Sequence, residues 1–285
     1  AMRLAKAAHM NPRAIAQAIV DHLPENNLVE SFEIAGPGFI NLTLTNASFQ
    51  AVVSEARQQG SDFGKSELSE PCKVNLEYVS ANPTGPMHVG HGRWAALGDA
   101  IARVMRHAGY SVDEEFYIND QGNQMNVFGN SVVVRYQQLL GQDVEMPEAC
   151  YGGAYIKDIA QAIIDADGDK WLDADEDERL VAFRERGYAM MLDSVKDTLS
   201  TFGNNFDTWF SERSLFVADE NGETKQQRAF DVMNEKGLLF EAEGATFFRS
   251  TDYGDDKDRV LVKANGDLTY FIPLRQNAAR LRSPD

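Results

Sequence analysis

The sequence predicts an α/β fold with a parallel sheet, and the order of its elements carries this prediction. Strand-like runs at 72–80 and 111–118 flank a helical pattern at 89–109. A strand, a helix and a second strand in this order form a βαβ unit, which implies parallel strands and a right-handed crossover. A long, mostly helical stretch at about 127–205 then precedes the strand-like NFDTWFS. We interpret this stretch as an insertion between strands of the sheet.

A small α/β domain is predicted at 1–66, and the linker-like GSDFGKSELSEP leads into a second domain, 67–285. Asn11 followed by proline is a helix N-cap with a proline in the first turn, which starts the helix PRAIAQAIVDHL. Two strands, LVESFEIA and FINLTL, surround the turn GPG, and Asn46 is expected to cap a further helix. In the second domain we expect a late helix, ETKQQRAFDVMNEKG, and short strands within LLFEAEGATFFRS, DRVLVKANG and DLTYFIP.

Composition limits the class of protein. At 285 residues and 43% hydrophobic content, the chain is long enough for one large or two smaller globular domains. No stretch approaches the roughly 18 apolar residues of a membrane span, and the first residues lack a secretory signal core. Cys72 and Cys150 are far apart and outside any C-x-x-C pair, so we expect no disulfide framework, no cysteine zinc site and a cytoplasmic location. The net charge of −17 argues against a protein that coats nucleic acid.

The loop SANPTGPMHVGH, between the first strand of the βαβ unit and its helix, is the candidate ligand site. Ligands of open α/β sheets bind beyond the carboxyl ends of the strands, and a helix N-terminus favours anions. Gly85 and Gly90 allow close backbone approach, and His88 and His91 can face one way and donate hydrogen bonds to phosphate oxygens. An isolated pair of this kind is more often only a helix start. No third ligand indicates a metal, and a G-x-x-x-x-G-K-[ST] loop is absent.

Several strings, in the same order, resemble one family. HVGH resembles the HIGH signature of class I aminoacyl-tRNA synthetases, and SANPTGPMHVGHGR is similar to its form in arginyl-tRNA synthetases. FYINDQGNQM, FDTWFSE and DYGDDKDRVLVKANGDLTYF are similar to further arginyl-enzyme motifs. AMRLAKAAHMNPRAIAQAIVDHL and IAGPGFINLTL resemble the additional N-terminal domain of that family. The resemblance implies a class I synthetase-like Rossmann nucleotide-binding fold with a helical insertion, preceded by part of a small tRNA-binding domain.

The resemblance also implies a reaction, in which arginine and ATP form arginyl-adenylate and pyrophosphate before the arginyl group passes to arginine tRNA. It implies that His88 and His91 are catalytic, and it assigns ATP binding to five residues, Pro83, Gly85, His88, Gly90 and His91. It assigns arginine binding to Ser80, Asn82, Glu212 and Tyr270, and a guanidinium does suit a carboxylate. Without the family, an exposed acid is the favoured interpretation of Glu212, and a core aromatic is as good an interpretation of Tyr270. Mg²⁺ is expected with ATP and not in a dedicated protein site.

The resemblance ends abruptly after Phe271, where the family continues with a segment like TPDIAYH and this chain reads IPLRQNAARLRSPD. Leu274 stands where the family has an aspartate that helps to hold the arginine side chain. We therefore expect a truncated synthetase with an incomplete sheet, unable to aminoacylate tRNA, whose open sheet edge allows self-association. A natural end and a reading-frame change or artificial end remain alternatives.

Two other interpretations of function stay open. The first is a non-catalytic ATP-binding or interaction module derived from such an enzyme. The second is another nucleotidyltransferase with an H-x-G-H helix start, which explains neither Glu212 nor the N-terminal domain. The string NDQGN, which includes Asn119 and Asp120, matches the family but suggests no role for each residue. The acidic run at 165–179 has Lys170 where a calcium loop needs glycine.

Overall fold

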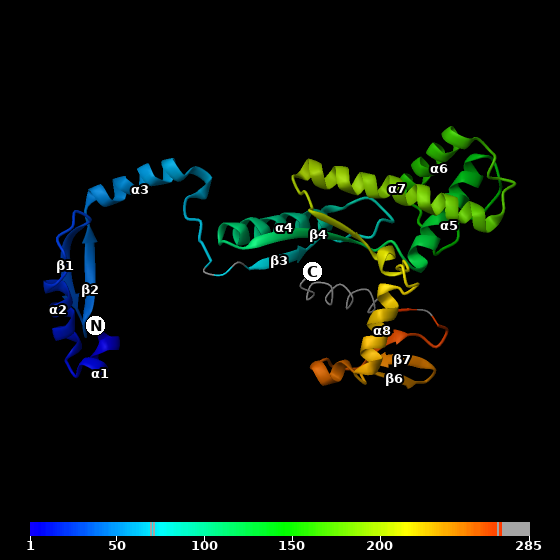
Figure 1. Ribbon diagram of the computed structural model, residues 1–285. Coiled ribbons are helices and arrows are strands. Elements are labelled where there is room, and N and C mark those ends of the chain that lie inside the picture. Colours follow the sequence, from blue (N-terminus) through cyan, green and yellow to red (C-terminus); the bar gives the residue numbers. More distant parts are fainter. Residues whose placement is uncertain (69, 71, 267, 270–285) are drawn as a thin grey trace. The chain divides into compact units, whose positions relative to one another are not determined.

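The computed structural model describes residues 1–68, 70, 72–266 and 268–269 (Figure 1). Contacts between Cα atoms divide the chain into two compact units, Ala1–Glu67 and Leu68–Asp285. Most of the strand expected in DLTYFIP lies outside the described residues, as do Tyr270 and Leu274. In the described ranges, no helix is both long enough and apolar enough to cross a membrane.

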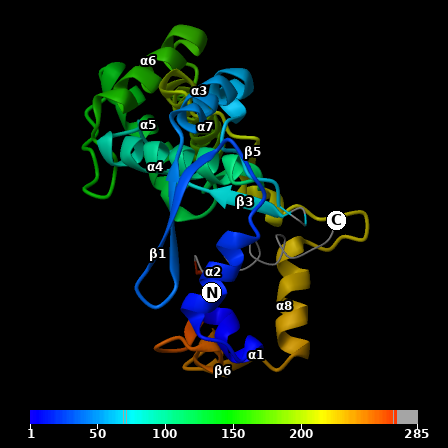
Figure 2. The ribbon, with the colours of Figure 1, turned by 90° about the vertical axis from the view of Figure 1, so that its left-hand side faces the viewer.

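The first unit packs a helix against an antiparallel hairpin, which Figure 2 shows in blue. Its elements are η1 (Met2–Leu4), α1 (Ala5–Ala8), α2 (Pro12–Asp21), β1 (Val29–Ala35), β2 (Phe39–Leu44), α3 (Asn46–Gln59) and η2 (Gly60–Asp62). The hairpin turn brings Gly38, at φ +125°, so close to α2 that a Cβ there would lie 2.8 Å from the Pro12 carbonyl oxygen. Glycine is therefore required where the hairpin meets the helix.

The helix starts of this unit follow from local capping. The Asn11 side chain accepts a hydrogen bond from the Arg13 N–H at 2.8 Å, which confirms the predicted cap of α2. At α3 the cap is Thr45 and not Asn46. Thr45 has an extended backbone, and its hydroxyl oxygen accepts the Ser48 N–H at 3.3 Å, so Asn46 is already the first helical residue.

The second unit contains a parallel sheet with strand order β3-β4-β5, which confirms the predicted α/β class. Its first elements are β3 (Lys73–Glu77), α4 (Val89–His107), β4 (Ser111–Ile118), α5 (Asn123–Leu139), α6 (Ala154–Asp167), α7 (Glu176–Phe202), β5 (Thr208–Ser211) and η3 (Glu212–Leu215). The three helices between β4 and β5 pack on one another around their own core, which includes Phe128, Tyr136, Ile156, Ile159 and Phe183.

Helix α4 lies close against the sheet because its buried face is small. Ala95, Gly98 and Ala102 form that face, and a Cβ at Gly98 would lie 2.2 Å from the ring of Tyr78. Helix α7 covers the sheet beside it, where Val195 and Leu199 pack with Phe116 and Ala95. The helix and the strands of the βαβ unit are therefore held at short range by residues without long side chains.

One flank of α4 is apolar and exposed. It comprises Trp94, Leu97, Ile101 and Val104, which are 51%, 59%, 40% and 68% exposed. On a helical wheel this stripe lies opposite His88, Gly92 and Ala95, which line a cavity of about 360 Å³ against α7. The stripe thus lies on the side of α4 away from α7, next to β3, which among the described strands pairs only with β4.

A second, antiparallel sheet follows in the sequence. It is formed by β6 (Leu239–Ala242), β7 (Ala245–Phe248) and β8 (Arg259–Val262), together with α8 (Lys225–Glu235) and η4 (Ser250–Tyr253). Phe248 and Leu261 are buried here against Phe230 and Met233 of α8. The predicted late helix and the first two groups of short strands are confirmed.

Candidate active site

The carboxyl ends of β3, β4 and β5 meet at one edge of the parallel sheet, because the three strands run the same way. The loop 78–88 leaves this edge toward α4, the loop 119–122 leaves it toward α5, and η3 starts there directly after β5. Open α/β sheets bind their ligands at this edge. The histidine pair, Asp120 and Glu212 are therefore all placed at the ligand-binding edge.

His88 and His91 form the first turn of α4 as a reciprocal pair. His88 is the N-cap, and its Nδ1 accepts the Gly90 N–H at 3.1 Å, while Nδ1 of His91 accepts the His88 N–H at 3.3 Å. The two rings stack with their centroids 3.7 Å apart. A Cβ at Gly90 would lie 2.9 Å from the His88 ring, so glycine is needed for this stack. The pair therefore caps the helix start, as expected for an isolated pair of this kind, and both capping side chains are imidazoles.

The hydrogen bonds of the pair fix the ring tautomers. A ring nitrogen that accepts a hydrogen bond carries no proton, so the proton of each neutral ring sits on Nε2. Burial and the neighbouring His88 lower the pKa of His91, which keeps that ring neutral at pH 7. Both Nε2–H groups remain as donors at a helix N-terminus, where backbone N–H groups and the helix dipole favour an anion.

The backbone at the end of β3 is strained. Val79 and Ser80 both have positive φ, 65° and 41°, and the Ser80 N–H donates to the Tyr78 carbonyl at 2.9 Å. Such conformations are costly for residues with a Cβ, above all a β-branched one. The turn brings the Ser80 hydroxyl back to the strand ends, where it donates to Glu77 of β3 at 2.9 Å and accepts the Tyr117 N–H of β4 at 3.1 Å.

Hydrogen bonds to helices of the insertion hold the rest of the loop. The Asn82 amide donates to Gln124 of α5 at 2.9 Å, and the Tyr155 hydroxyl of α6 donates to the Thr84 carbonyl at 2.8 Å. A Cβ at Gly85 would lie 3.1 Å from that hydroxyl, and Pro83 of the same loop is buried. Gly85 therefore serves the packing of Tyr155 as well as any ligand.

Glu212 is a buried carboxyl with unusual electrostatics. Only 8% of the residue is exposed, and among the described residues no cationic side chain pairs with it. Burial and the negative charge of Asp120 raise the pKa of Glu212 to about 7, and the nearby Tyr117 hydroxyl lowers it to a smaller extent. That hydroxyl is itself buried and makes no hydrogen bond of normal geometry with a described residue. A carboxyl of this kind gains if a cation enters the site.

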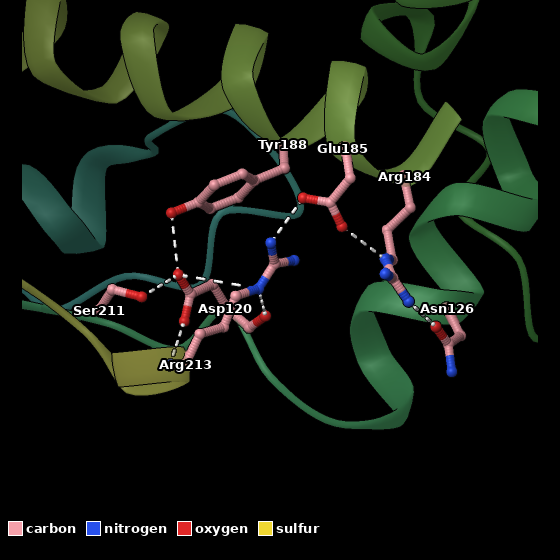
Figure 3. A network of polar contacts seen from close by, with 7 residues as sticks. All are labelled: Asp120, Asn126, Arg184, Glu185, Tyr188, Ser211 and Arg213. Atoms are coloured by element: carbon pink, nitrogen blue, oxygen red, sulfur yellow. Dashed lines mark hydrogen bonds and ion pairs between the residues drawn. The ribbon is translucent and has the colours of Figure 1, made fainter. Parts of the chain in front are cut away.

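Asp120, in the loop after β4, is the centre of a polar network that joins this loop to β5, η3 and α7 (Figure 3). It is 1% exposed and accepts hydrogen bonds from the Tyr188 hydroxyl at 2.9 Å and the Ser211 hydroxyl at 2.6 Å. The Arg213 N–H donates to its other oxygen at 3.1 Å, and the Arg213 side chain pairs with Glu185 at 2.5 Å. The sequence offered no role for Asp120 because its partners are 68 to 93 residues away.

Some predicted site residues come together in the structure and others do not. Ser80 contacts the backbone N–H of Tyr117 and Glu212 lies near the hydroxyl of the same residue, and His88 and His91 are in contact. Asn82 is exposed, and Tyr270 falls outside the described residues. The assignment of individual residues to ATP or arginine stays a prediction. In the part of the chain that the structure describes, no group of three or more His, Cys, Asp or Glu residues is arranged to hold a metal.

Comparison with known proteins agrees with the resemblance. Residues 52–280 match the family model for the catalytic domain of class I (R) tRNA synthetases, and residues 1–44 match the model for the arginyl-tRNA synthetase N-terminal domain. The chain belongs to the arginyl-tRNA synthetase family. It is 47% identical over 272 residues to the arginine–tRNA ligase of Geobacter sp. strain M21 and 45% identical over 274 residues to that of Staphylococcus carnosus.

Solved structures show the same family fold. A candidate arginyl-tRNA synthetase from Campylobacter jejuni aligns with a TM-score of 0.74 at 31% identity, over 85% of this chain and 51% of that one. The Thermus thermophilus arginyl-tRNA synthetase aligns with a TM-score of 0.58 at 25% identity, over 97% of this chain and 46% of that one. The alignment with the Geobacter relative covers 95% of this chain but only 48% of that protein. The chain thus spans about half the length of the curated proteins it matches.

Proposed function

We propose that this chain binds L-arginine and ATP at the carboxyl edge of its parallel sheet, as the arginine-activating part of an arginine–tRNA ligase. One observation carries the proposal. A buried carboxyl that pairs with no cationic side chain of the described residues, Glu212, lies at the same sheet edge as a helix N-terminus that carries two imidazole donors, His88 and His91. A site for a cation and a site for a polyanion at one edge suit a reaction between arginine and ATP.

The histidine turn is the proposed phosphate site. The Nε2–H groups of His88 and His91 donate to phosphate oxygens and stabilise the negative charge that develops as pyrophosphate leaves. Pro83, Gly85 and Gly90 shape the loop that contacts ATP. Mg²⁺ arrives with ATP as part of the substrate.

The proposed arginine site is centred on Glu212 after β5, two strands from β3 in the sheet. The Glu212 carboxylate pairs with the guanidinium, whose fork of donors fits a carboxylate. Ser80 and Asn82 lie at the end of β3 and contact the amino-acid end of the substrate. Tyr270, outside the described residues, completes the pocket in this proposal.

The chemistry is an attack by an arginine carboxylate oxygen on the α-phosphorus of ATP. The new P–O bond gives arginyl-adenylate, the bond to the β-phosphate breaks, and pyrophosphate leaves. In the second step the arginyl group passes to arginine tRNA, and residues 1–66 are the proposed part of the tRNA-binding N-terminal domain. We expect no charging by this chain alone, because Leu274 replaces an aspartate that the family resemblance places on the arginine side chain.

A comparison of arginine with citrulline tests the proposal. Citrulline has the same length but carries a neutral ureido group, so binding through Glu212 predicts saturable heat with arginine and none with citrulline. Glu212→Gln should abolish the difference, because the loss of a buried charge partner costs about 2–5 kcal/mol. Equal binding of both ligands by the unaltered chain would contradict a cation site at Glu212.

A contact for a second copy of the chain is proposed at the outer edge of β3. The apolar stripe of α4 borders this edge, and an exposed apolar patch next to a strand edge that no described strand covers indicates an interaction surface. In an antiparallel copy of β3 centred on Asn75, Lys73 lies opposite Glu77, so the strand is complementary to itself in charge. This surface is also the observation that favours an interaction module as the second candidate function.

A further inference from the structure

The backbone on both sides of Glu212 is held by one side chain. Asp120 accepts the hydroxyl of Ser211 on Oδ2 and the backbone N–H of Arg213 on Oδ1. Ser211 and Arg213 are the residues directly before and after Glu212. The Asp120 main-chain carbonyl also accepts a hydrogen bond from the Arg213 Nε–H at 2.7 Å, so two hydrogen bonds join Asp120 to Arg213.

The guanidiniums of the network around Asp120 pair with its other carboxylates. The Arg213 guanidinium pairs with Glu185 and lies over the Tyr188 ring at 4.8 Å. Arg184 donates to Glu185 at 2.9 Å and to Asn126 at 2.8 Å. Three carboxyl groups in this cluster, those of Asp120, Glu185 and Glu212, thus face two guanidiniums. The cluster carries one negative charge in excess when all three are ionised, and the excess resides at Glu212.

We propose that Asp120 is the positioning residue of the arginine site. It fixes Glu212 through the residues directly before and after Glu212. Its negative charge, added to that of Glu212, makes the pocket select a ligand with one positive charge. This inference rests on the proposed function for the identity of the ligand, a guanidinium. Asp120 itself does not touch the ligand. Its carboxylate is fully occupied by Tyr188, Ser211 and Arg213.

Burial of Glu212 and, after it, the charge of Asp120 raise the pKa of Glu212 and so set the pH range in which the site works. Glu212 is faced by Tyr117 from β4 and by Asp120 from the loop after it, while Arg213 of η3 and Glu185 and Tyr188 of α7 surround Asp120. Glu77 of β3 acts on Tyr117. Because the negative charge of Asp120 raises the pKa of Glu212, loss of this charge lowers that pKa and extends guanidinium binding to lower pH.

The test compares three substitutions in the full chain with two readouts. Asp120→Asn removes the charge and keeps the shape. Asp113→Asn is the matched control, because Asp113 is an exposed carboxylate near the start of β4, the strand that precedes Asp120. Ser211→Ala removes one of the two clasping hydrogen bonds and leaves the charge. The first readout is the pH titration of the Glu212 carboxyl by NMR with ¹³C-labelled glutamate, assigned with Glu212→Gln. The second is the pH profile of arginine affinity.

For Asp120→Asn we expect the titration midpoint of Glu212 to fall by about one pH unit, with weaker arginine binding at pH 8. For Ser211→Ala we expect an affinity loss of several-fold and an unchanged midpoint, and for Asp113→Asn no change in either. A midpoint in Asp120→Asn equal to that of the control overturns the proposal. If Asp120→Asn does not fold, unaltered affinity in Ser211→Ala overturns it.

The two proposals fail in distinguishable ways. If the unaltered chain binds no arginine but the Glu212 midpoint still falls in Asp120→Asn, the ligand assignment is wrong and the positioning role stands. If arginine binds and neither the midpoint nor the affinity responds to Asp120→Asn and Ser211→Ala, the positioning role is wrong and the arginine site stands.

Discussion

His88 and His91 stack face to face at the start of α4, and each Nδ1 accepts a backbone N–H of the same turn. One pair of side chains therefore closes the helix end and presents two Nε2–H donors to an incoming anion. The H-x-x-H pair can therefore serve both as a helix cap and as an anion site, because Nδ1 of each ring caps the helix and Nε2–H is left to donate to a ligand.

This division predicts different effects for two substitutions at one position. His88→Ala removes the N-cap and should lower the free energy of unfolding by about 0.5–2 kcal/mol. His88→Asn keeps a good capping residue and should restore most of that stability without restoring the imidazole donor. Urea unfolding of both variants checks the first statement, and binding of an ATP analogue checks the second. Full nucleotide affinity in His88→Asn would show that the cap alone matters.

A pair of glycines on α4 tests the close contact between helix and sheet. Gly98→Ala places a Cβ 2.2 Å from the Tyr78 ring and should destabilise the second unit by about 1–3 kcal/mol. Gly92→Ala meets nothing within 4 Å and should stabilise the helix by about 0.5–1 kcal/mol. Chemical denaturation followed by tryptophan fluorescence measures both. Stabilisation by Gly98→Ala together with destabilisation by Gly92→Ala would contradict the close packing of α4 on the sheet.

The raised pKa of Glu212 predicts that the free energy of unfolding falls as pH rises. A carboxyl whose pKa is raised in the folded state, here to about 7, favours folding when it is protonated. The contribution is fully present below pH 4.5 and is lost as pH rises through 7. Glu212→Gln, which cannot ionise, should be more stable than the unaltered chain at pH 8, by on the order of 1–3 kcal/mol, and the gain should vanish near pH 4. Parallel unfolding curves of the two proteins across this range would speak against a raised pKa.

Self-association through the β3 edge and α4 stripe predicts a concentration-dependent mass. Sedimentation of the unaltered chain should show a dimer that dissociates on dilution. Leu97→Asp, in the middle of the stripe, should be monomeric with unchanged stability, since Leu97 is 59% exposed. Val181→Asp on α7, at a residue that is 47% exposed, is the matched control and should still dimerise. A monomer at all concentrations would remove the proposed contact.

Sequence reasoning succeeded where the signal is local. The caps at Asn11 and the turn between β1 and β2 follow from neighbouring residues, and the order strand, helix, strand fixed the parallel sheet. It could not foresee that the apolar periodicity of Trp94, Leu97 and Ile101 marks an uncovered flank, because periodicity gives a face and not its partner. The buried face of α4 instead consists of small residues.

The candidate site divides in the same way. The family resemblance singled out Glu212 and the histidines, while the residues alone favoured an exposed acid at position 212, and the structure shows a buried one. The positive φ angles of Val79 and Ser80 have no sequence signature, since neither is glycine. Asp120 was visible as part of a matching string, but its role depends on Tyr188, Ser211 and Arg213, which only the tertiary fold brings to it.

A calorimetric titration of this chain with a non-hydrolysable arginyl-adenylate analogue tests the arginine and ATP site most directly, because the analogue engages the cation and the phosphate sites together. We expect saturable binding that weakens roughly 10- to 100-fold in a His88→Ala, His91→Ala double variant, since two hydrogen bonds to a charged group are lost. His107→Ala, on the far end of the same helix, should bind like the unaltered chain. Absence of heat at high protein concentration, or equal affinity in the double variant, would contradict an arginine and ATP site at this sheet edge.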